Sequence, residues 1–319
     1  MQRLFSLGIC DKKMGDFHMN QNVLSQLGFI SLVVFSVFQF ESAAGQQQRN
    51  FDDIEIVPHR VAGNIYYLEG SGGNIGLSIG EDGVIMIDDQ FAQLTEKIVS
   101  AIRELSGQEI RFLINTHVHG DHTGGNENFG AMGVMILAQD RVRLRLSEGL
   151  GDGQAAPYPE VALPVLTYSD AITLNINGEE VHAFSVPPAH TDGDSFVHFR
   201  TSDVLHLGDV FRTTGFPFID VSNGGTVQGT LEALEIAIRL AGPNTTIIPG
   251  HGGLSTRDDV TEFRDMILTV TERVSRLISQ NRTLDQVFSA GVTADFENKW
   301  GNPERFLIGL YQDLASNGN

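Results

Sequence analysis

One short segment of the chain concentrates side chains that bind metal ions. Three histidines and an aspartate lie within six residues, at His117, His119, Asp121 and His122. They directly follow an apolar stretch, residues 111–115, whose pattern predicts a β-strand. Neutral imidazoles suit zinc, and a carboxylate can complete a second site beside it. Because chance seldom produces this ligand spacing, the segment predicts a metal-binding loop at the end of a strand.

The spacing within the segment suggests that the loop serves two ions. His117 and His119 are two residues apart, so their side chains project to the same side of an extended backbone. Asp121 and His122 come where the chain turns into the next helix, and they can face another way. Three glycines allow this turn and a close approach of the backbone, namely Gly120, Gly124 and Gly125.

Three further candidate ligands stand at the ends of other predicted strands. They are His190, Asp209 and His251, each after an apolar stretch and beside a glycine or proline. Strand ends are where α/β sheets place functional side chains. Spacing alone does not decide whether these three join the loop. The other histidines have no second ligand beside them and are expected to be structural: His18, His59, His182, His198 and His206.

The predicted elements alternate between strands and helices, twice over. In the first half we expect strands at residues 64–69, 75–79, 84–87, 111–115 and 134–138, with a helix at 93–105. In the second half we expect strands at 172–176, 180–186, 195–200, 204–207 and 245–248, a helix at 226–240, and a long helix capped by Thr256. This order suggests an α/β fold with two packed sheets and helices outside, a four-layer α/β/β/α sandwich.

The N-terminus has the pattern of an export signal. An apolar run at residues 27–38 is short for a membrane span but suits a signal peptide, and small residues follow at 42–45. We expect residues 1–45 to be a signal peptide and 46–319 to be one domain in the periplasm or outside the cell. An uncleaved membrane anchor is the alternative, and translation starts at Met1 or Met19.

The composition limits the classes of partner that the protein can bind. A formal net charge of −19 would repel a phosphate polyanion, which makes nucleic acid a poor partner. Hydrophobic residues make up 41% and charged residues 19%, which indicates a substantial core rather than disorder. We expect a small-molecule substrate and no stable membrane contact after signal removal. The oligomeric state is left open.

The metal-binding segment resembles the T-H-x-H-x-D-H signature of the metallo-β-lactamase superfamily. His190, Asp209 and His251 follow in the family's order at plausible separations. The resemblance covers roughly residues 54–289. It implies the α/β/β/α sandwich, with the metal site at one edge of the two sheets. It is specific for the superfamily but not for the substrate.

The resemblance also implies a role for each ligand. His117, His119 and His190 would hold a first ion, and Asp209 would bridge the two ions. A second ion would fall to Asp121, His122 and His251. Asp88 matches the family's early aspartate, which orients ligands from outside the first coordination sphere, although a plain turn residue is the alternative.

Asp209 separates this chain from the best-known zinc β-lactamases, many of which have a cysteine there. The only cysteine is Cys10, within the predicted leader. In having an aspartate at this position, the chain is similar to the glyoxalase II, lactonase and related branches of the superfamily. Two segments, residues 193–195 and 215–220, resemble a periplasmic group of superfamily hydrolases. The resemblance therefore favours a broad metallohydrolase over a specialised cysteine-type β-lactamase.

The expected activity is zinc-dependent hydrolysis. Two zinc ions would generate a metal-bound hydroxide that opens a β-lactam, lactone or thioester acyl bond. Asp121 is the candidate to hold or relay the proton of the water. Arg212 is the candidate to bind a substrate carboxylate, with a solvated surface charge as the alternative. Three phenylalanines are candidates for an apolar wall or for the core: Phe211, Phe216 and Phe218.

Two other classes of function stay open at this point. The same fold with iron serves non-haem oxidoreductases, although the predicted export disfavours that class. A non-catalytic metal-binding protein is the third possibility, and the full ligand set makes it the weakest. The metal content separates zinc from iron, and a panel of acyl substrates separates an enzyme from a carrier.

Overall fold

The structure is a computed structural model that describes residues 50–149 and 156–317. The signal peptide predicted at residues 1–45 lies outside these ranges, as does His18. Within the described part of the chain, no helix combines the length and apolar character needed to cross a bilayer. By its internal contacts, Arg49–Asn319 forms one compact unit.

The first half of this unit forms a mixed sheet of seven strands. In spatial order they are β1 (Val57–Ala62), β2 (Ile65–Glu69), β3 (Ile75–Gly80), β4 (Gly83–Ile87), β5 (Ile110–Asn115), β6 (Met135–Gln139) and β7 (Leu166–Tyr168). Strands β1 to β4 are antiparallel, and β4 to β7 run parallel. Strand β4 is buried along its whole length, as its unbroken apolar sequence suggests for a central strand. Because β5 and β6 are parallel, their carboxyl ends lie at the same edge of the sheet.

The second half forms a sheet of five strands. Their spatial order is β12 (Thr246–Ile248), β11 (Val204–His206), β10 (Ser195–Phe199), β9 (Glu179–Ser185) and β8 (Ala171–Ile176). Neighbours are antiparallel except β11 and β12, which run parallel with His206 opposite Ile248. The chains leaving β11 and β12 therefore emerge at the same edge.

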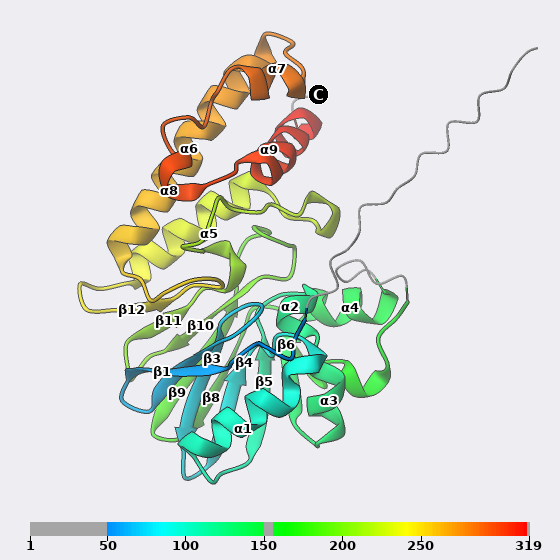
Figure 1. Cartoon of the computed structure of the whole chain (residues 1–319), viewed down its shortest axis with the longest axis vertical. Helices are drawn as coiled ribbons and strands as arrows, with labels where there is room; N and C mark the ends of the chain where they lie inside the picture. Colours follow the sequence, from blue (N-terminus) through cyan, green and yellow to red (C-terminus); the bar gives the residue numbers. More distant parts are fainter. Residues whose placement is uncertain (1–49, 150–155, 318–319) are drawn as a thin grey trace, which may run out of the picture. The chain divides into compact units, whose positions relative to one another are not determined.

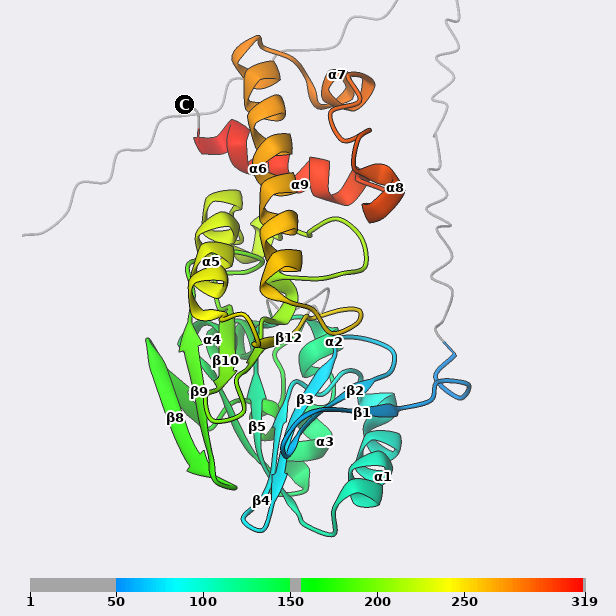
Figure 2. The ribbon, with the colours of Figure 1, turned by 90° about the vertical axis from the view of Figure 1, so that its left-hand side faces the viewer.

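Helices lie outside the two sheets. Those of the first half are α1 (Thr95–Leu105), α2 (Gly120–Thr123), α3 (Asn126–Ala131) and α4 (Asp140–Glu148). Those of the second half are α5 (Val227–Leu240), α6 (Arg257–Ser279), α7 (Leu284–Ser289), α8 (Glu297–Trp300) and α9 (Glu304–Asn317). Figures 1 and 2 show α7 at the end of α6 that is distant from the sheets, with α8 and α9 alongside α6. Helix α6 begins at the predicted cap, because Thr256 and Asp259 form a capping box.

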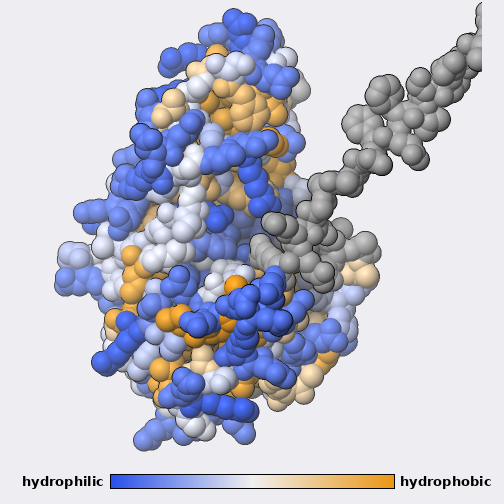
Figure 3. Space-filling model, in the orientation of Figure 1, coloured by the Kyte–Doolittle hydropathy of each residue, from blue (hydrophilic) through white to orange (hydrophobic). Residues whose placement is uncertain are grey.

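Three apolar clusters define the layers. The middle cluster joins the facing sides of the two sheets, with Ile85 and Ile114 from the first and Val181 and Val197 from the second. A second cluster packs α1 on the first sheet, and a third packs α5, α6 and α9 on the second. The predicted α/β/β/α sandwich is thus confirmed. Hydrophilic residues cover most of the face seen in Figure 3, in keeping with the acidic composition.

Several elements have no counterpart in the predictions. The predicted helix 93–105 begins as a 3-10 turn, Ala92–Leu94, before α1 starts. Strands β1 and β7 and helices α3, α4, α7, α8 and α9 were not predicted. Trp300 belongs to this unpredicted C-terminal segment. Its ring lies 5.3 Å from that of Phe263 in α6, and this contact joins the C-terminal helices to the core.

Candidate metal centre

The predicted loop lies at the end of β5, as the sequence suggests. His119 has an extended backbone immediately before α2, so the side chains of His117 and His119 share one side. Helix α2 begins at Gly120 and carries Asp121 and His122 in its first turn. The change from extended chain to helix therefore turns the last two ligands to another face of the same loop.

A first group of ligands unites two histidines of the loop with a distant third. One nitrogen each from His117, His119 and His190 lies within 4.8 Å of the others, and all three residues are buried. His190 comes from the segment between β9 and β10, and its Nε2 is 2.7 Å from His119 Nδ1. The fold thus joins the loop to a residue that sequence spacing could not place.

A second group lies beside the first. One ligand atom each from Asp121, His122 and His251 again falls within 4.8 Å of the others. Asp209 stands between the groups: its Oδ1 is 3.2 Å from His122 Nε2 and 3.1 Å from His251 Nε2, and its Oδ2 is 3.7 Å from His190 Nε2. This is the position expected of a bridging carboxylate. The parallel pairing of β11 and β12 explains why Asp209 and His251 lie side by side.

The hydrogen bonds of the first group show which nitrogens are free to bind. His119 donates through Nε2 to Asp220 Oδ2 at 2.8 Å, and His190 donates through Nδ1 to the Phe218 carbonyl at 2.6 Å. The two nitrogens that face each other at 2.7 Å are therefore both bare lone pairs. Such a pair repels unless a cation lies near both, so the arrangement suits a metal ion.

The loop histidines repeat this pattern. Thr116 donates its hydroxyl to Asp88 Oδ2 at 2.7 Å, which leaves its oxygen to accept from His117 Nδ1 at 3.0 Å. His122 donates through Nδ1 to Asp88 Oδ2 at 2.7 Å. His117 consequently presents a bare Nε2 to the site, and His122 presents its Nε2 there once that nitrogen has released its proton. Asp88 thus contacts both Thr116 and His122, where it could orient ligands, and it does so from a left-handed backbone at φ 63°.

Buried atoms without partners test whether a metal fits. His117 Nε2, His122 Nε2 and Asp209 Oδ1 are buried and make no hydrogen bond within the described ranges. Leaving a buried polar atom unsatisfied costs about 1–3 kcal/mol, so three such atoms in one site require an explanation. Imidazole nitrogens and carboxylate oxygens that converge in this way fit zinc or iron ions.

The electrostatics give two of the histidines and the shared carboxylate the protonation states of ligands. Burial, reinforced by neighbouring histidines, lowers the pKa of His117 well below its usual value and that of His190 to about 3. Burial would raise the pKa of Asp209, but His251 and His122 outweigh it and hold that pKa well below the usual value. Neutral imidazoles beside an ionised carboxylate are ready to bind a cation without first releasing protons.

His122 differs from these two histidines. Burial alone would lower its pKa, but the carboxylates of Asp209, Asp88 and Asp121 raise it well above the usual value. The acidic surroundings thus demand a positive charge at this point. A metal ion can supply that charge in place of the proton, and metal binding should then release a proton here.

A pocket of about 450 Å³ opens onto the two groups. Its lining includes His119, Asp121, Asp209 and His251. Arg212 also lines it: the residue pairs with His251 in a parallel bridge, and its Nε donates to the Thr214 carbonyl at 2.8 Å. The structure thus places four of the seven predicted ligands, together with Arg212, on one cavity, and it groups the other three with them: His117, His122 and His190. Of the three phenylalanines, only Phe218 lines it, whereas Phe211 and Phe216 are buried in the core.

Two residues of the site escaped the sequence analysis. Asp220, which holds His119, is separated from it by 101 positions, and only a general resemblance in residues 215–220 drew attention to its segment. Arg305, from the start of α9, lines the pocket with its guanidinium carbon 3.4 Å from the centroid of the Phe218 ring. No local pattern around Arg305 connects it to a metal site.

The other histidines of the described ranges lie outside the ligand groups. His59 is 3.2 Å from Glu69 at the surface, and His182 bonds with Thr173. His206 is buried and bonds with the Asn74 carbonyl. Among the described residues, neither these three nor His198 belongs to a three-ligand group.

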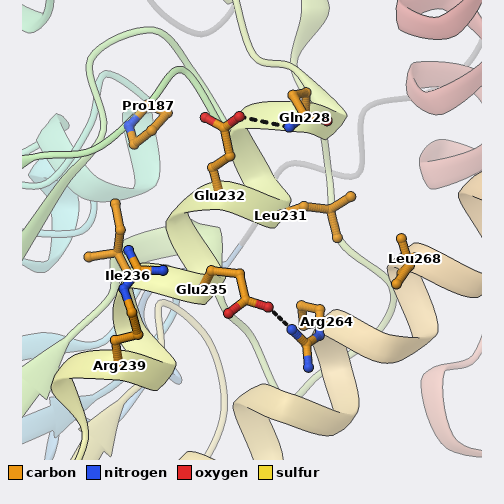
Figure 4. A pocket seen from close by; sticks show the side chains of 9 residues that line it. All are labelled: Pro187, Gln228, Leu231, Glu232, Glu235, Ile236, Arg239, Arg264 and Leu268. Carbon is orange, nitrogen blue, oxygen red and sulfur yellow. Dashed lines mark hydrogen bonds and ion pairs between the residues drawn. The ribbon is translucent and has the colours of Figure 1, made fainter.

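A second cavity, of about 550 Å³, lies between α5 and α6 (Figure 4). Its polar side chains are mostly engaged with one another, as in the ion pair of Arg264 with Glu235 and the hydrogen bond of Gln228 with Glu232. None of its lining residues belongs to a ligand group in the described part of the chain. The metal-ligand pocket is therefore the candidate active site.

Comparison with known proteins agrees with this site. The family model described as "Metallo-beta-lactamase superfamily" matches residues 62–251, which extend from the first sheet to the last ligand. A hydroxyacylglutathione hydrolase of Nitrosococcus oceani is 31% identical over 157 residues, which are 47% of this chain and 52% of the relative. One of Rhodospirillum rubrum is 27% identical over 199 residues, 62% of this chain and 67% of the relative. The chain thus spans about half to two thirds of the length of these relatives.

Solved structures show the same fold. The DIM-1 metallo-β-lactamase superimposes with a TM-score of 0.56 at 19% identity, over 68% of this chain and 99% of that one. A metallo-β-lactamase from Pontibacter korlensis gives 0.56 at 15% identity, over 67% and 99%. At such identities the likeness shows the fold and leaves the substrate open. About a third of this chain has no equivalent in these enzymes.

Proposed function

This chain belongs to the metallo-β-lactamase superfamily, and on that premise we propose that it is a two-zinc hydrolase that cleaves an acyl bond in a small molecule. The observation that carries the proposal is the pair of ligand groups with Asp209 between them. His117, His119 and His190 would hold one ion, and Asp121, His122 and His251 the other. Bound zinc would supply Lewis-acid chemistry, polarising the scissile carbonyl and acidifying a water molecule.

The protein's own residues would position the reactants. Asp121 is partly exposed, with 25% of its side chain accessible, and its Oδ2 is 3.4 Å from His251 Nε2. It can therefore accept a proton at the floor of the pocket and pass it towards solvent. Arg212 keeps its terminal nitrogens free of hydrogen bonds within the described ranges, so it can hold a substrate carboxylate. Phe218 forms an apolar wall beside His119 that limits the access of water.

The sequence relatives order the candidate substrates. Both are hydroxyacylglutathione hydrolases, and Asp209 stands where many zinc β-lactamases have cysteine. We therefore place a hydroxyacyl thioester first, followed by lactones and β-lactams. The limited share of the relatives that is matched leaves all three classes for experiment.

Elemental analysis and a substrate panel test the proposal. We expect two zinc ions per chain, and turnover of at least one of a glutathione thioester, an acyl-homoserine lactone and a chromogenic cephalosporin. His117→Ala or His119→Ala should abolish zinc binding at the first group and turnover together, because each removes a ligand. His182→Ala, a change at a surface histidine, is the matched control and should leave both intact. Turnover by the metal-free protein would refute the proposal. Iron in place of zinc would instead favour oxidoreductase chemistry.

We further propose that residues 1–45 direct export. The apolar run at residues 27–38 and the small residues after it support this reading. Mass spectrometry of the protein from a periplasmic fraction should find a chain that begins near residue 46. A full-length chain in the cytoplasm would contradict this proposal without affecting the metal site.

A further inference from the structure

The C-terminal helices contribute a cation to the candidate active site. Arg305 lies at the beginning of α9 and lines the same pocket as His119 and Asp121. The superfamily match ends at residue 251, so Arg305 is contributed by the part of the chain beyond that match. A residue in this position can adapt a common metal centre to a particular substrate.

A stack of rings determines where the Arg305 guanidinium lies. Its central carbon is 3.4 Å from the centroid of the Phe218 ring, and that ring lies 5.8 Å from the His119 ring at an interplanar angle of 23°. The Phe218 carbonyl in turn accepts from the first-group ligand His190. A guanidinium over an aromatic face keeps its N–H groups directed outward at its edges, free for a planar anion. The cation is therefore held one aromatic ring away from the first ligand group.

Among the described residues, Arg305 has no carboxylate partner, although the chain has an excess of acid. Acidic residues number 40 against 21 basic ones, and arginines elsewhere form ion pairs with them, such as Arg145 with Asp192 and Arg273 with Asp295. Within the described ranges, Arg305 makes neither a hydrogen bond nor an ion pair. Its charge is thus available at a pocket whose other polar groups converge on the metal ligands.

The two arginines of the pocket stand at different ligand groups. Arg212 adjoins His251, of the second group, and its Nε is committed to Thr214. Arg305 stands over Phe218 and His119, on the side of the first group. We propose that Arg305 binds a carboxylate of the substrate on the first-group side, so that the C-terminal helices select anionic acyl substrates. This inference rests on the proposed function, whose substrate class it narrows.

Paired substrates test this selection in the full-length, zinc-loaded protein. Lactoylglutathione and its diethyl ester, and a chromogenic cephalosporin and its methyl ester, differ in carboxylate charge. We expect Arg305→Ala to lower kcat/KM for the acids about tenfold, through KM, because a charge-assisted hydrogen bond at a partly screened site is lost. The esters should change little. Arg305→Lys should keep part of the preference, because it retains the charge without the planar stack.

The control variant removes the same charge from the same C-terminal segment. Arg282→Ala changes an exposed arginine that lies outside the pocket, and it should behave as wild type on acids and esters. The Arg305 proposal is overturned if Arg305→Ala weakens acids and esters equally, or if Arg282→Ala matches its effect. Circular dichroism of both variants identifies a general folding defect.

A binding measurement separates this inference from the proposed function, because it requires no turnover. Calorimetry would compare dicarboxylates from succinate to adipate with monocarboxylates of the same length. We expect at least one dicarboxylate to bind wild type more tightly than its matched monocarboxylate, and this difference to disappear in Arg305→Ala but persist in Arg282→Ala. No difference in wild type would refute the anion site even in an active enzyme. A difference in an inactive protein would support the anion site and refute only the hydrolase.

Discussion

Asp220 offers a sharp test of how the first ligand group is built. Its Oδ2 accepts from His119 Nε2 at 2.8 Å, and both side chains are nearly buried, with 10% and 6% exposed. Its oxygens also accept from the Ser222 hydroxyl and from the backbone and side chain of Asn223. Every neighbour is a donor, so only a carboxylate satisfies them all.

Asp220→Asn should therefore impair metal binding although it preserves shape. If the new NH₂ group faces His119, it forces the proton onto Nδ1, the nitrogen that must bind the ion. If it faces Ser222 and Asn223, donor meets donor at a buried position. Loss of such an outer partner lowers metal affinity about 10–100-fold, equivalent to about 1.4–2.7 kcal/mol. The defect should fall on the ion held by the first group, because Asp220 bonds to no ligand of the second.

A competitive zinc titration against a chromophoric chelator measures this effect on metal-stripped protein. Wild type should bind two equivalents tightly, whereas Asp220→Asn should bind one tightly and the other 10–100-fold more weakly. Ser222→Ala is the matched control, because it removes one donor to the carboxylate and keeps the bond to His119. The reasoning is refuted if Asp220→Asn binds both ions as wild type does, or if both affinities fall equally.

Two further predictions concern stability. Phe263 is fully buried in α6 between Phe211 and Trp300, so Phe263→Ala should lower the free energy of unfolding in urea by about 3–5 kcal/mol, and a loss under about 1 kcal/mol would contradict the packing described. Burial raises the pKa of Tyr168, whose hydroxyl donates to Ser195 at 3.0 Å. The folded pKa therefore lies above the unfolded value of about 10, so the contribution of Tyr168 to the free energy of unfolding is complete below that pH. Above it, this contribution is lost by up to about 1.4 kcal/mol per pH unit. Tyr168→Phe should therefore reduce the fall in unfolding free energy between pH 9 and 11, and an equal fall in both proteins would argue against this linkage.

The sequence was most informative about structural features that depend only on residues close together in the chain. The alternation of apolar residues predicted most strands of both sheets, and Thr256 correctly predicted the start of α6. The ligands of the loop could be read from spacing, because an extended segment followed by a helical turn has known side-chain directions. The motif then supported the correct fold class through its resemblance to a family.

The predictions failed where the local sequence pattern is weak, and where an element is stabilised mainly by its contacts with distant elements. Strand β1 (VPHRVA) contains a proline and two polar residues and is never fully buried, and β7 has only three residues, so neither shows a clear apolar alternation. The C-terminal helices have contacts with α5 and α6 that only the folded chain reveals. The cleavage of the leader and the identity of the metal remain predictions.

By itself, the sequence determined where the candidate metal-binding loop lies, because a strand, a turn and four potential ligands fall within a few residues. Spacing alone left the three distant ligands open and only the family resemblance pointed to them, whereas the tertiary structure shows why they lie together. His190, Asp209 and His251 converge because their strands end at one edge, and pairing between strands depends on contacts that sequence separation does not encode. The same reason applies to Asp220 and Arg305. Asp220 bonds to His119, 101 positions away, and Arg305 places a cation over the neighbouring Phe218 ring. Both contacts form only when the layers of the fold pack together.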